Sequence, residues 1–426
     1  MQLNKIFFVL SFFISLNLYS QTNSSLFNNM LINQNIEFLQ KDSSHTNVLQ
    51  LPALGFYINV FSNPNISSFT SINDNQIVID FNQYKNSIRD ISNHILDIKN
   101  RLFYYAYRHK NHVYSIGVDH RFFFELSSSK EFASLFIDGN YQFLNQTIHF
   151  GDEQNLNSMN YFSIFLGFSK QINNDIFIAS KLKILKGISL LGSEYFNCNF
   201  STSENYGSSS NPYSSVLYTD VNFFINTDNS IRSNLGLATD IYVKYDYSEK
   251  LSIYASILDL GFITWKESHY RSRGYFQFDG LDYELNQFLT TEFNNLQDSV
   301  LNIFDFEQPD NIKSSRLIPF NIDIGLSCQL NSTSFLKPSL HMTKLASSIL
   351  YSGSLAYEMN FEKHHISLTP SYSFNKFNYT NLSIFLNKKW HSKLYTNFYF
   401  SDLISLINTK NSGNAIGLGL EIYLFF

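Results

Sequence analysis

Hydrophobic and polar residues alternate along most of the chain, and the alternation is clearest in its last twelve residues. One face of this segment carries only apolar side chains: Ile416, Leu418, Leu420, Ile422, Leu424 and Phe426. Successive side chains of a strand point to opposite faces, so the segment is predicted to be a strand with one apolar face. A final strand that ends on an aromatic residue is typical of bacterial outer-membrane barrels, whose last strand must close against the first.

The same period of two predicts further strands, most of them paired as hairpins across short turns. The predicted strands cover residues 52–61, 102–109, 112–126, 160–172, 175–186, 235–247, 251–265, 320–330, 336–342, 349–361, 365–377, 381–387, 393–400 and 415–426. Short turns alternate with long connections, as in barrels whose short turns lie in the periplasm. We therefore predict an all-β, antiparallel transmembrane barrel of about 14 strands (roughly 12–16, given boundary errors).

Two stretches depart from this period. Ile88, Ile91, Ile95 and Ile98 recur at helical spacing and predict a short amphipathic helix over 85–100. Glu267–Arg316 is the longest interruption of the strand pattern, and apolar residues between positions 285 and 303 predict a second helix within it. Both helices are expected in loops, or as plugs packed on the barrel.

The start of the chain predicts export. Residues 1–20 are expected to be a signal peptide, with Lys5 followed by the apolar run Ile6–Leu16, which is too short to span a bilayer. Cleavage is expected between Ser20 and Gln21. Residues 21–50 are rich in Asn, Ser and Gln and are predicted to form an irregular periplasmic or plug-like segment. Residues 51–426 are predicted to form one outer-membrane β-barrel.

Composition agrees with this location and limits the partners. Aromatic residues make up 17% of the chain, which suits strands that face lipid on one side and are flanked by aromatic girdles. The net charge of -5 is spread out without a basic block, so nucleic acid is not an expected partner, whereas outer-membrane lipid is. Cys198 and Cys328 are too few for a disulfide framework, and Cys328 is predicted to face lipid.

Charged residues on the polar faces of the strands are the candidate lumen-lining residues. They are Asp119, Arg121, Glu125, Lys181, Lys183, Asp240, Lys244 and Asp323. Such charges either brace a barrel interior through ion pairs or line a selective transport pathway, and the pattern leaves both interpretations open. The aromatic residues Trp265, Trp390 and Phe426, near strand ends, are predicted to lie at the membrane interface.

No catalytic or metal site is predicted. The close histidine pairs His109/His112 and His364/His365 lack the further ligands of a metal site. His120 is the only strand-central histidine weighed as a catalytic base, and its register places it on the apolar face. No nucleophile-elbow or phosphate-loop motif accompanies it. We therefore expect a non-enzymatic protein without a cofactor.

Several stretches together resemble a known family. They are the Gln21 start, Asp138-Gly139-Asn140 within 132–150, Lys181–Gly187 and Leu258–Lys266. They resemble a Bacteroidota outer-membrane barrel family known mainly as a domain of unknown function. That family is similar to FadL/PorV-type barrels and, more loosely, to the PorP/SprF-type membrane proteins of type IX secretion and gliding. The resemblance implies an outer-membrane barrel of about fourteen strands and association with secretion or surface proteins. Residues 21–50 depart from it, because they lack a compact plug motif.

Three functional hypotheses follow. The first, favoured by the resemblance and the long polar loops, is a monomeric barrel that docks or scaffolds a secretion-system or cell-surface protein. The second is a FadL-like passive transporter of hydrophobic or small solutes, which requires a continuous lumen or a lateral gap. The third is a soluble, secreted β-protein.

Overall fold

The structure is a computed structural model of the chain. The structure describes residues 45–64, 68–73, 76–151, 153–204, 213–226, 228, 230–278, 310–375, 381–401 and 414–426. The predicted signal peptide, most of the predicted irregular segment, and the predicted helix between positions 285 and 303 lie outside these residues.

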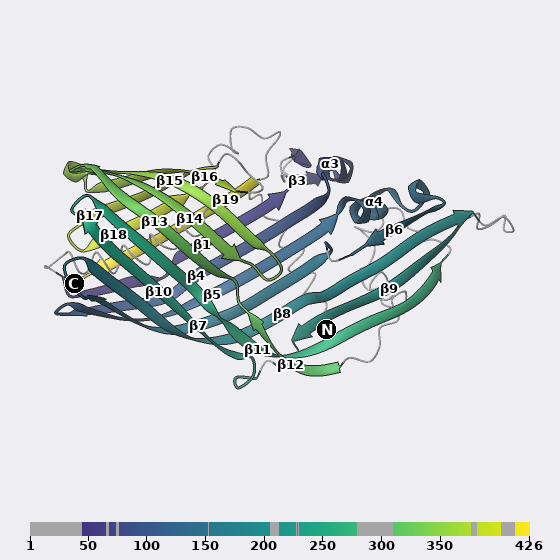
Figure 1. Ribbon diagram of the computed structural model, residues 1–426, viewed down its shortest axis with the longest axis horizontal. Helices are drawn as coiled ribbons and strands as arrows, with labels where there is room; N and C mark the ends of the chain where they lie inside the picture. The colour runs from purple at the N-terminus through teal and green to yellow at the C-terminus, as the bar shows by residue number, and fades with distance from the viewer. Residues whose placement is uncertain are drawn as a thin grey trace.

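Fourteen strands of the described chain close into one antiparallel barrel (Figure 1). In order around the barrel they are β1 (Asn47–Asn63), β4 (Ile91–His109), β5 (His112–Ser129), β7 (Asn155–Gln171), β8 (Ile176–Glu204), β10 (Leu235–Ser248), β11 (Leu251–Phe278), β13 (Phe320–Asn331), β14 (Ser334–Lys344), β15 (Ile349–Phe361), β16 (Ile366–Asn375), β17 (Asn381–His391), β18 (Leu394–Phe400) and β19 (Asn414–Phe425). The last strand pairs with the first over 11 residue pairs, from Val48↔Phe425 to Ser62↔Asn414. The predicted fold class and strand number are confirmed.

The outer surface of the barrel is apolar. Leu166, Leu182 and Leu340 expose 62–68% of their surface, whereas Lys181 and Lys183, which flank Leu182 on β8, are 5% exposed. The period-two pattern therefore puts hydrocarbon outside and charge inside. Because closure pairs the backbone groups of the strands, such a surface suits lipid, and the fold is that of an outer-membrane barrel. This surface excludes the soluble alternative.

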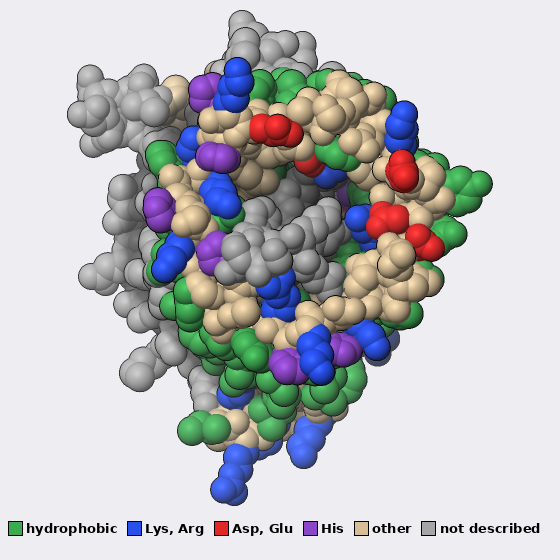
Figure 2. Space-filling model, turned by 90° about the vertical axis from the view of Figure 1, so that its left-hand side faces the viewer, with side chains coloured by type: hydrophobic (Ala, Val, Ile, Leu, Met, Phe, Trp, Pro, Cys, Tyr) green, Lys and Arg blue, Asp and Glu red, His purple; other side chains and the backbone are tan. Residues whose placement is uncertain are grey.

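The two ends of the barrel differ. At one end, the connections 110–111, 172–175, 249–250, 332–333, 362–365 and 392–393 are short turns, and the chain ends there at Phe426. Figure 2 looks onto this end and shows Lys, Arg and His side chains gathered around its rim. Most connections at the opposite end are long. Short turns mark the periplasmic end of bacterial barrels, so the long connections are extracellular.

Two strands run well past the barrel at the extracellular end, as the long β8 and β11 arrows of Figure 1 show. Their extensions pair with β6 (Gln146–Phe150), β9 (Tyr213–Asn226) and β12 (Asp310–Leu317). Phe132 and Leu135 of helix α4 (Lys130–Asp138) pack against this extension. The strand pattern had placed the ends of β8 and β11 at residues 186 and 265, so this projecting sheet was not predicted.

Smaller elements complete the extracellular side and the turns. β2 (Thr70–Asn73) and β3 (Gln76–Ile79) form a separate hairpin, followed by helix α3 (Phe81–Ser87). The 3-10 turns η2 (Tyr141–Phe143) and η3 (Glu362–His364) lie in connections. Among the described residues, no helix has both the length and the apolar character needed to cross a membrane.

The predicted helix over 85–100 is wrong for most of its length. α3 ends at Ser87, and Ile91, Ile95 and Ile98 belong to strand β4. These β-branched residues fit a strand, and pairing with both β1 and β5 satisfies the backbone of β4 on each side. Hydrogen bonding to a strand on each side therefore outweighs the helical spacing of the isoleucines.

The interface assignment of Trp265 is also wrong. Trp265 is fully buried in the lumen, and its ring fills the space that a Cβ on Gly187 would need. The cause is a β-bulge in β11 at Asp259, whose φ is +62°. Before the bulge Ile253 and Ile257 point outward. Beyond it the odd-numbered residues point inward, because one extra residue reverses the two faces.

Trp390 and Phe426 are 60% and 51% exposed and lie at or beside the short-turn end, while their place at the interface stays a prediction. Both cysteines are free thiols, and Cys198 is buried in the extracellular extension. Cys328 is partly buried on β13, between the exposed Leu326 and Leu330.

Candidate functional site

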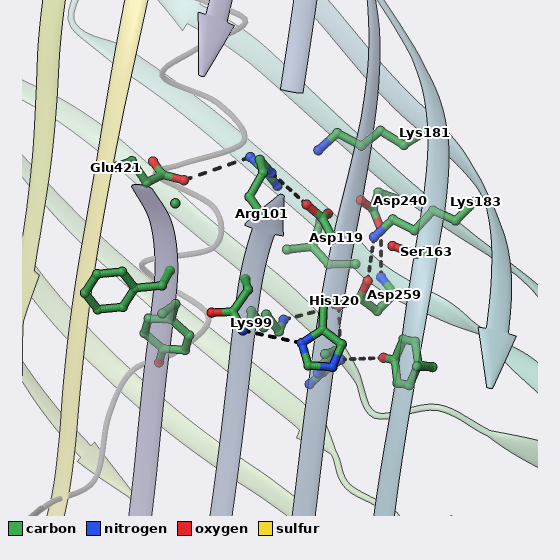
Figure 3. A pocket seen from close by; sticks show the side chains of 17 residues that line it. Lys99, Arg101, Asp119, His120, Ser163, Lys181, Lys183, Asp240, Asp259 and Glu421 are labelled. Atoms are coloured by element: carbon green, nitrogen blue, oxygen red, sulfur yellow. Dashed lines mark hydrogen bonds and ion pairs between the residues drawn. The ribbon is translucent and has the colours of Figure 1, made fainter. Parts of the chain in front are cut away.

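A charged pocket of about 70 Å³ lies in the lumen (Figure 3). Its lining brings together ionisable side chains from β4, β5, β8, β10, β11 and β19. These are the cations Lys99, Arg101, Arg121, Lys181 and Lys183 and the carboxylates Asp119, Asp240, Asp259 and Glu421. Aromatic rings and small polar groups, among them Tyr57, Tyr161 and Ser163, complete the wall. The pocket is therefore polar, and its volume is that of a few water molecules.

Arg121 connects opposite sides of the lumen. Its guanidinium forms a two-point ion pair with Asp97 on the neighbouring strand β4, at 2.8 and 2.9 Å. The same group donates to Asp259 Oδ2 at 3.1 Å and to the Pro319 carbonyl at 2.7 Å, which lie on or beside β11 and β13 across the lumen. Arg121 is 4% exposed, so these bonds replace the water that the charge would otherwise require.

Asp259 is the centre of the network. It accepts from Arg121, from Lys99 Nζ at 3.2 Å and from Lys183 Nζ. Lys183 also pairs with Asp240 at 2.7 Å, and Asp240 accepts the backbone N–H of Asp259 at 2.7 Å. The bulge that reverses β11 therefore also brings the Asp259 carboxylate inward, where it bridges three cations.

A second, smaller group lies on the periplasmic side of this network. Arg101 Nε donates to Asp119 Oδ1 at 2.9 Å, and its Nη1 lies 3.9 Å from Glu421 Oε1. The guanidinium carbon is 5.4 Å from the centre of the Tyr104 ring and 5.9 Å from that of Phe165. Below these rings the lumen becomes apolar and aromatic, with Tyr395, Tyr423 and Phe425 in one buried cluster with them.

The turn between β14 and β15, residues 345–348, crosses the lumen on the extracellular side of the pocket. Leu345 is 5% exposed and packs against Phe61, Ile95 and Phe123, which belong to β1, β4 and β5. Strands β15 to β19 separate β14 from β1 on one side of the barrel, and five strands separate β14 from β5 on the other, so this turn reaches the opposite wall.

Glu125 of β5 holds the turn in place. Its carboxylate accepts the backbone N–H of Ser347 at 3.1 Å and the hydroxyl of Ser348 at 2.6 Å. Ala346 packs against a second apolar cluster that contains Leu185, Ile263 and Trp265. We call residues 345–348 the occluding turn, because they join the two clusters into an apolar layer above the charged pocket.

The wall formed by β14 to β17 is different, since small hydroxyl groups cover much of it. Buried hydroxyl side chains on its inner face are Ser339, Ser354, Thr369, Ser371, Ser373 and Ser383. Pairs of ionisable side chains interrupt them. His341 Nδ1 lies 2.6 Å from Asp323 Oδ1, and His341 Nε2 lies 3.0 Å from Ser354 Oγ. Lys337 of β14 pairs with Glu358 of β15.

The Asp323–His341–Ser354 order resembles that of a hydrolytic triad, but its surroundings are those of a structural brace. Ser354 pairs with Ser339 on β14 and with Ser373 on β16, so the backbone around it is hydrogen-bonded to the strands on both sides. Catalysis at a serine needs donors aimed at a developing oxyanion, and paired strand N–H groups do not supply them. The absence of enzymatic activity stays a prediction.

The eight predicted lumen-lining residues all lie on the inner face, but they do not form one site. Five of them line the pocket: Asp119, Arg121, Lys181, Lys183 and Asp240. Glu125 instead binds the occluding turn, Asp323 pairs with His341, and Lys244 pairs with Asp246 at 3.2 Å. Asp119 and Arg121, neighbours along β5, take different partners.

Sequence reasoning missed the partners of these residues. Asp97, Lys99 and Arg101 alternate along β4, but this signal was hidden by the predicted helix. Asp259 was missed because the bulge could not be predicted from the alternation alone. Glu421 lies on the polar face of the last strand and could have been nominated there.

No cluster of three or more His, Cys, Asp or Glu side chains able to hold a metal occurs among the residues that the structure describes. His120, which the sequence placed on the apolar face, lies 2.7 Å from Asn160 Oδ1 and packs against Phe162. The chemistry of the lumen is therefore that of ion pairs, hydroxyls and aromatic rings.

These features define an outer-membrane β-barrel with a charged pocket under an apolar closure. The chain belongs to the family of unknown function DUF5723, whose model matches residues 10–401. A search among curated proteins finds no match.

Similar solved structures include the P. putida toluene transporter TodX, with 9% identity over 91% of this chain and 92% of that chain, and a TM-score of 0.44. The Ralstonia pickettii toluene transporter TbuX shares 8% identity over 90% of both chains, with a TM-score of 0.45. A Pseudomonas aeruginosa FadL homologue shares 9% identity over 89% of both chains, with a TM-score of 0.41.

The predicted membership of a family of unknown function is confirmed, and FadL-type barrels are among the similar structures. The similarity to PorV-type and PorP/SprF-type proteins and the Bacteroidota origin stay predictions.

Proposed function

We propose that this chain is a passive outer-membrane transporter of small solutes, and that the occluding turn closes its lumen in the conformation described. The observation that carries the proposal is the position of this turn. A four-residue connection crosses the lumen and buries Leu345 against the far wall, directly above a polar pocket. Bracing of the barrel does not require such an insertion, because the ion network already connects opposite strands.

The occluding turn is also the part of the closure that can move at least cost. Among the described residues, its polar attachments to the far wall are the two bonds to Glu125, and its apolar contacts come mainly from Leu345 and Ala346. The network around Asp259, by contrast, contains several ion pairs that share partners, so moving one side chain would leave others unpaired. Displacing the turn therefore opens the extracellular side without disturbing the charged pocket, as expected for a gate drawn from a weakly attached segment.

The test is solute uptake by liposomes that contain the purified full-length chain. Glycerol, a small neutral solute, is compared in the wild type and in the double variant Leu345→Ser/Glu125→Gln, which removes the apolar contact and weakens the bonds of the turn. We expect faster glycerol uptake in the double variant than in the wild type. Leu330→Ser, an exposed leucine at the other end of the barrel, is the matched control and should behave as the wild type.

If the double variant folds, as shown by its slower migration on a gel after heating, and still admits no glycerol, the transport proposal is wrong. Uptake by the wild type that is unchanged in the double variant would leave transport standing and overturn the gating role of the turn.

Docking of a secretion-system or cell-surface protein stays a prediction. It rests on the family resemblance and on the long polar connections, above all 267–316, whose central residues 279–309 lie outside the described structure. No contact among the described residues favours it. Purification of the tagged chain from native membranes in mild detergent, with mass spectrometry of whatever accompanies it, would test it. Recovery of the barrel alone would count against docking and for transport.

A further inference from the structure

Four of the five cations that line the charged pocket have a carboxylate partner within hydrogen-bond distance. Lys99 and Lys183 bind Asp259, Arg101 binds Asp119, and Arg121 binds Asp97 and Asp259. Lys181 is the exception: within the described residues its ammonium group has no hydrogen bond and no ion pair. Figure 3 shows its side chain directed into the pocket, with no interaction drawn to it.

The position of Lys181 is built into the fold. Lys181 pairs in register with Gly167 on β7, and a Cβ added to Gly167 would lie 3.3 Å from Lys181 Cγ and 2.1 Å from Ser115 Oγ. The glycine thus makes room for the lysine stem. Lys181 is 5% exposed, so its charge has lost most of its contact with bulk water. A buried ammonium group without a partner is costly, and such groups are retained where something else compensates the charge.

The neighbours of Lys181 do not provide that compensation directly. Asp240 is its register neighbour on β10, but its Oδ1 is taken by Lys183 and by the Asp259 N–H, and its Oδ2 makes no hydrogen bond to Lys181 or to any other described residue. The closest contact that the structure gives for the ammonium group is the Phe165 ring, whose centre is 4.7 Å from Nζ. Arg101 lies against the same ring at 5.9 Å, so two cations meet at one aromatic side chain.

We infer that Lys181, with Arg101 beside it, forms a binding site for the carboxylate group of a small monocarboxylate. This inference rests on the proposed transport function and names the class of solute. An anion between the two cations would pair with the unpartnered ammonium group. The faces of Phe165 and Tyr104 would contact its short apolar part. The pocket volume of about 70 Å³ limits the ligand to a few heavy atoms, on the scale of propionate.

The charge balance of the pocket favours a single negative charge over a larger one. Five cations face four carboxylates in the lining, and Asp97, which lies behind Arg121, neutralises the fifth cation at a distance from Lys181. Bound at Lys181 and Arg101, a monoanion adds one negative charge to this balanced set. A dianion would bring an additional negative charge close to Asp119, Asp240 and Glu421.

The experiment compares propionate with propionamide, a neutral molecule of nearly the same shape, in liposomes containing the full-length chain. We expect the wild type to take up propionate about tenfold faster than propionamide, the size of effect that one hydrogen bond to a charged group provides. Lys181→Gln should bring this ratio close to one with little change for propionamide, and Lys181→Arg should keep most of the preference. Lys244→Gln, a lumen lysine outside the pocket, is the control and should keep the wild-type ratio.

Equal uptake of the two solutes by the wild type, or an unchanged ratio in Lys181→Gln, would overturn the site while leaving the transport function intact. Absence of uptake for both solutes would contradict the transport function instead. In that case the site is tested by the broadening of the ¹³C resonance of labelled propionate on binding to the purified protein in detergent. Broadening by the wild type that is lost in Lys181→Gln supports the site, and no broadening by the wild type overturns it.

Discussion

The wall of the lumen formed by β4, β5, β8, β10 and β11 carries charged side chains, whereas the wall formed by β14 to β17 carries mainly serine and threonine hydroxyls. Both walls come from the same alternation of apolar and polar residues along strands. Their polar groups nevertheless have different requirements. A buried charge needs a partner of opposite charge, while a buried hydroxyl can be left alone at modest cost.

This difference explains how far the polar side chains of each wall extend across the lumen. Charged side chains are long and find partners on distant strands, as Arg121 does with Asp259 and Lys99 does with the same carboxylate. The hydroxyls of β14 to β17 are short and stay near their own backbone. The charged wall thus stabilises the barrel across its width, and the hydroxyl wall leaves space beside it.

The largest expected effect comes from breaking the charged wall. Arg121→Met removes the ion-pair partner of Asp97, which remains buried, and one of the three cations bound by Asp259. It should destabilise the folded barrel by about 3–5 kcal/mol. The measurement is the urea midpoint of unfolding in detergent, followed by tryptophan fluorescence. The double variant Arg121→Met/Asp97→Asn should recover part of the loss, because it removes the uncompensated charge of Asp97. A single variant as stable as the wild type would show that the network does not brace the barrel.

A smaller effect is expected where the two walls meet, at the occluding turn. Glu125→Gln removes the charge that accepts from Ser347 and Ser348, and should cost about 1–2 kcal/mol of unfolding free energy. It should also raise glycerol uptake. Ser348→Ala, which removes one of the two bonds and leaves the carboxylate in place, should give a smaller change in both measurements. The reverse order of the two variants would contradict the assigned role of Glu125.

The smallest effect is expected in the hydroxyl wall. The hydroxyl of Ser371 has no hydrogen-bond partner among the described residues. Ser371→Ala should therefore change the unfolding free energy by less than about 0.5 kcal/mol in either direction. The same urea titration measures it, with Arg121→Met run alongside. A loss above about 1 kcal/mol would mean that the hydroxyl wall contributes to stability as the charged wall does.

The comparison also shows where sequence reasoning succeeds. The apolar outer face, the short turns, the number of strands and the closing role of the last strand follow from a local period of two, which each strand carries independently. The eight inward charges could be nominated in the same way, because a charge on the lipid face is costly and its strand neighbours reveal which face it occupies.

The failures have two physical causes, and both lie in how neighbouring strands pair. At Asp259, one additional residue in β11 reverses the two faces of the strand, so Trp265 points into the lumen and not toward the membrane interface. In β4 the isoleucines have a helical spacing, but pairing with β1 on one side and β5 on the other makes the segment a strand. Bulges depend on how neighbouring strands pair, and that information is absent from the strand itself.

The sequence by itself determined that this chain forms an outer-membrane barrel, because the preference of apolar side chains for lipid acts on each strand locally. Only the tertiary structure decided which charges meet. Closure of fourteen strands brings Arg121, Lys99 and Lys183 to Asp259 and carries Leu345 to the opposite wall. It leaves Lys181 with no hydrogen bond or ion pair to the part of the chain that the structure describes. Those contacts join residues more than one hundred positions apart in most cases, and they exist only because the barrel closes.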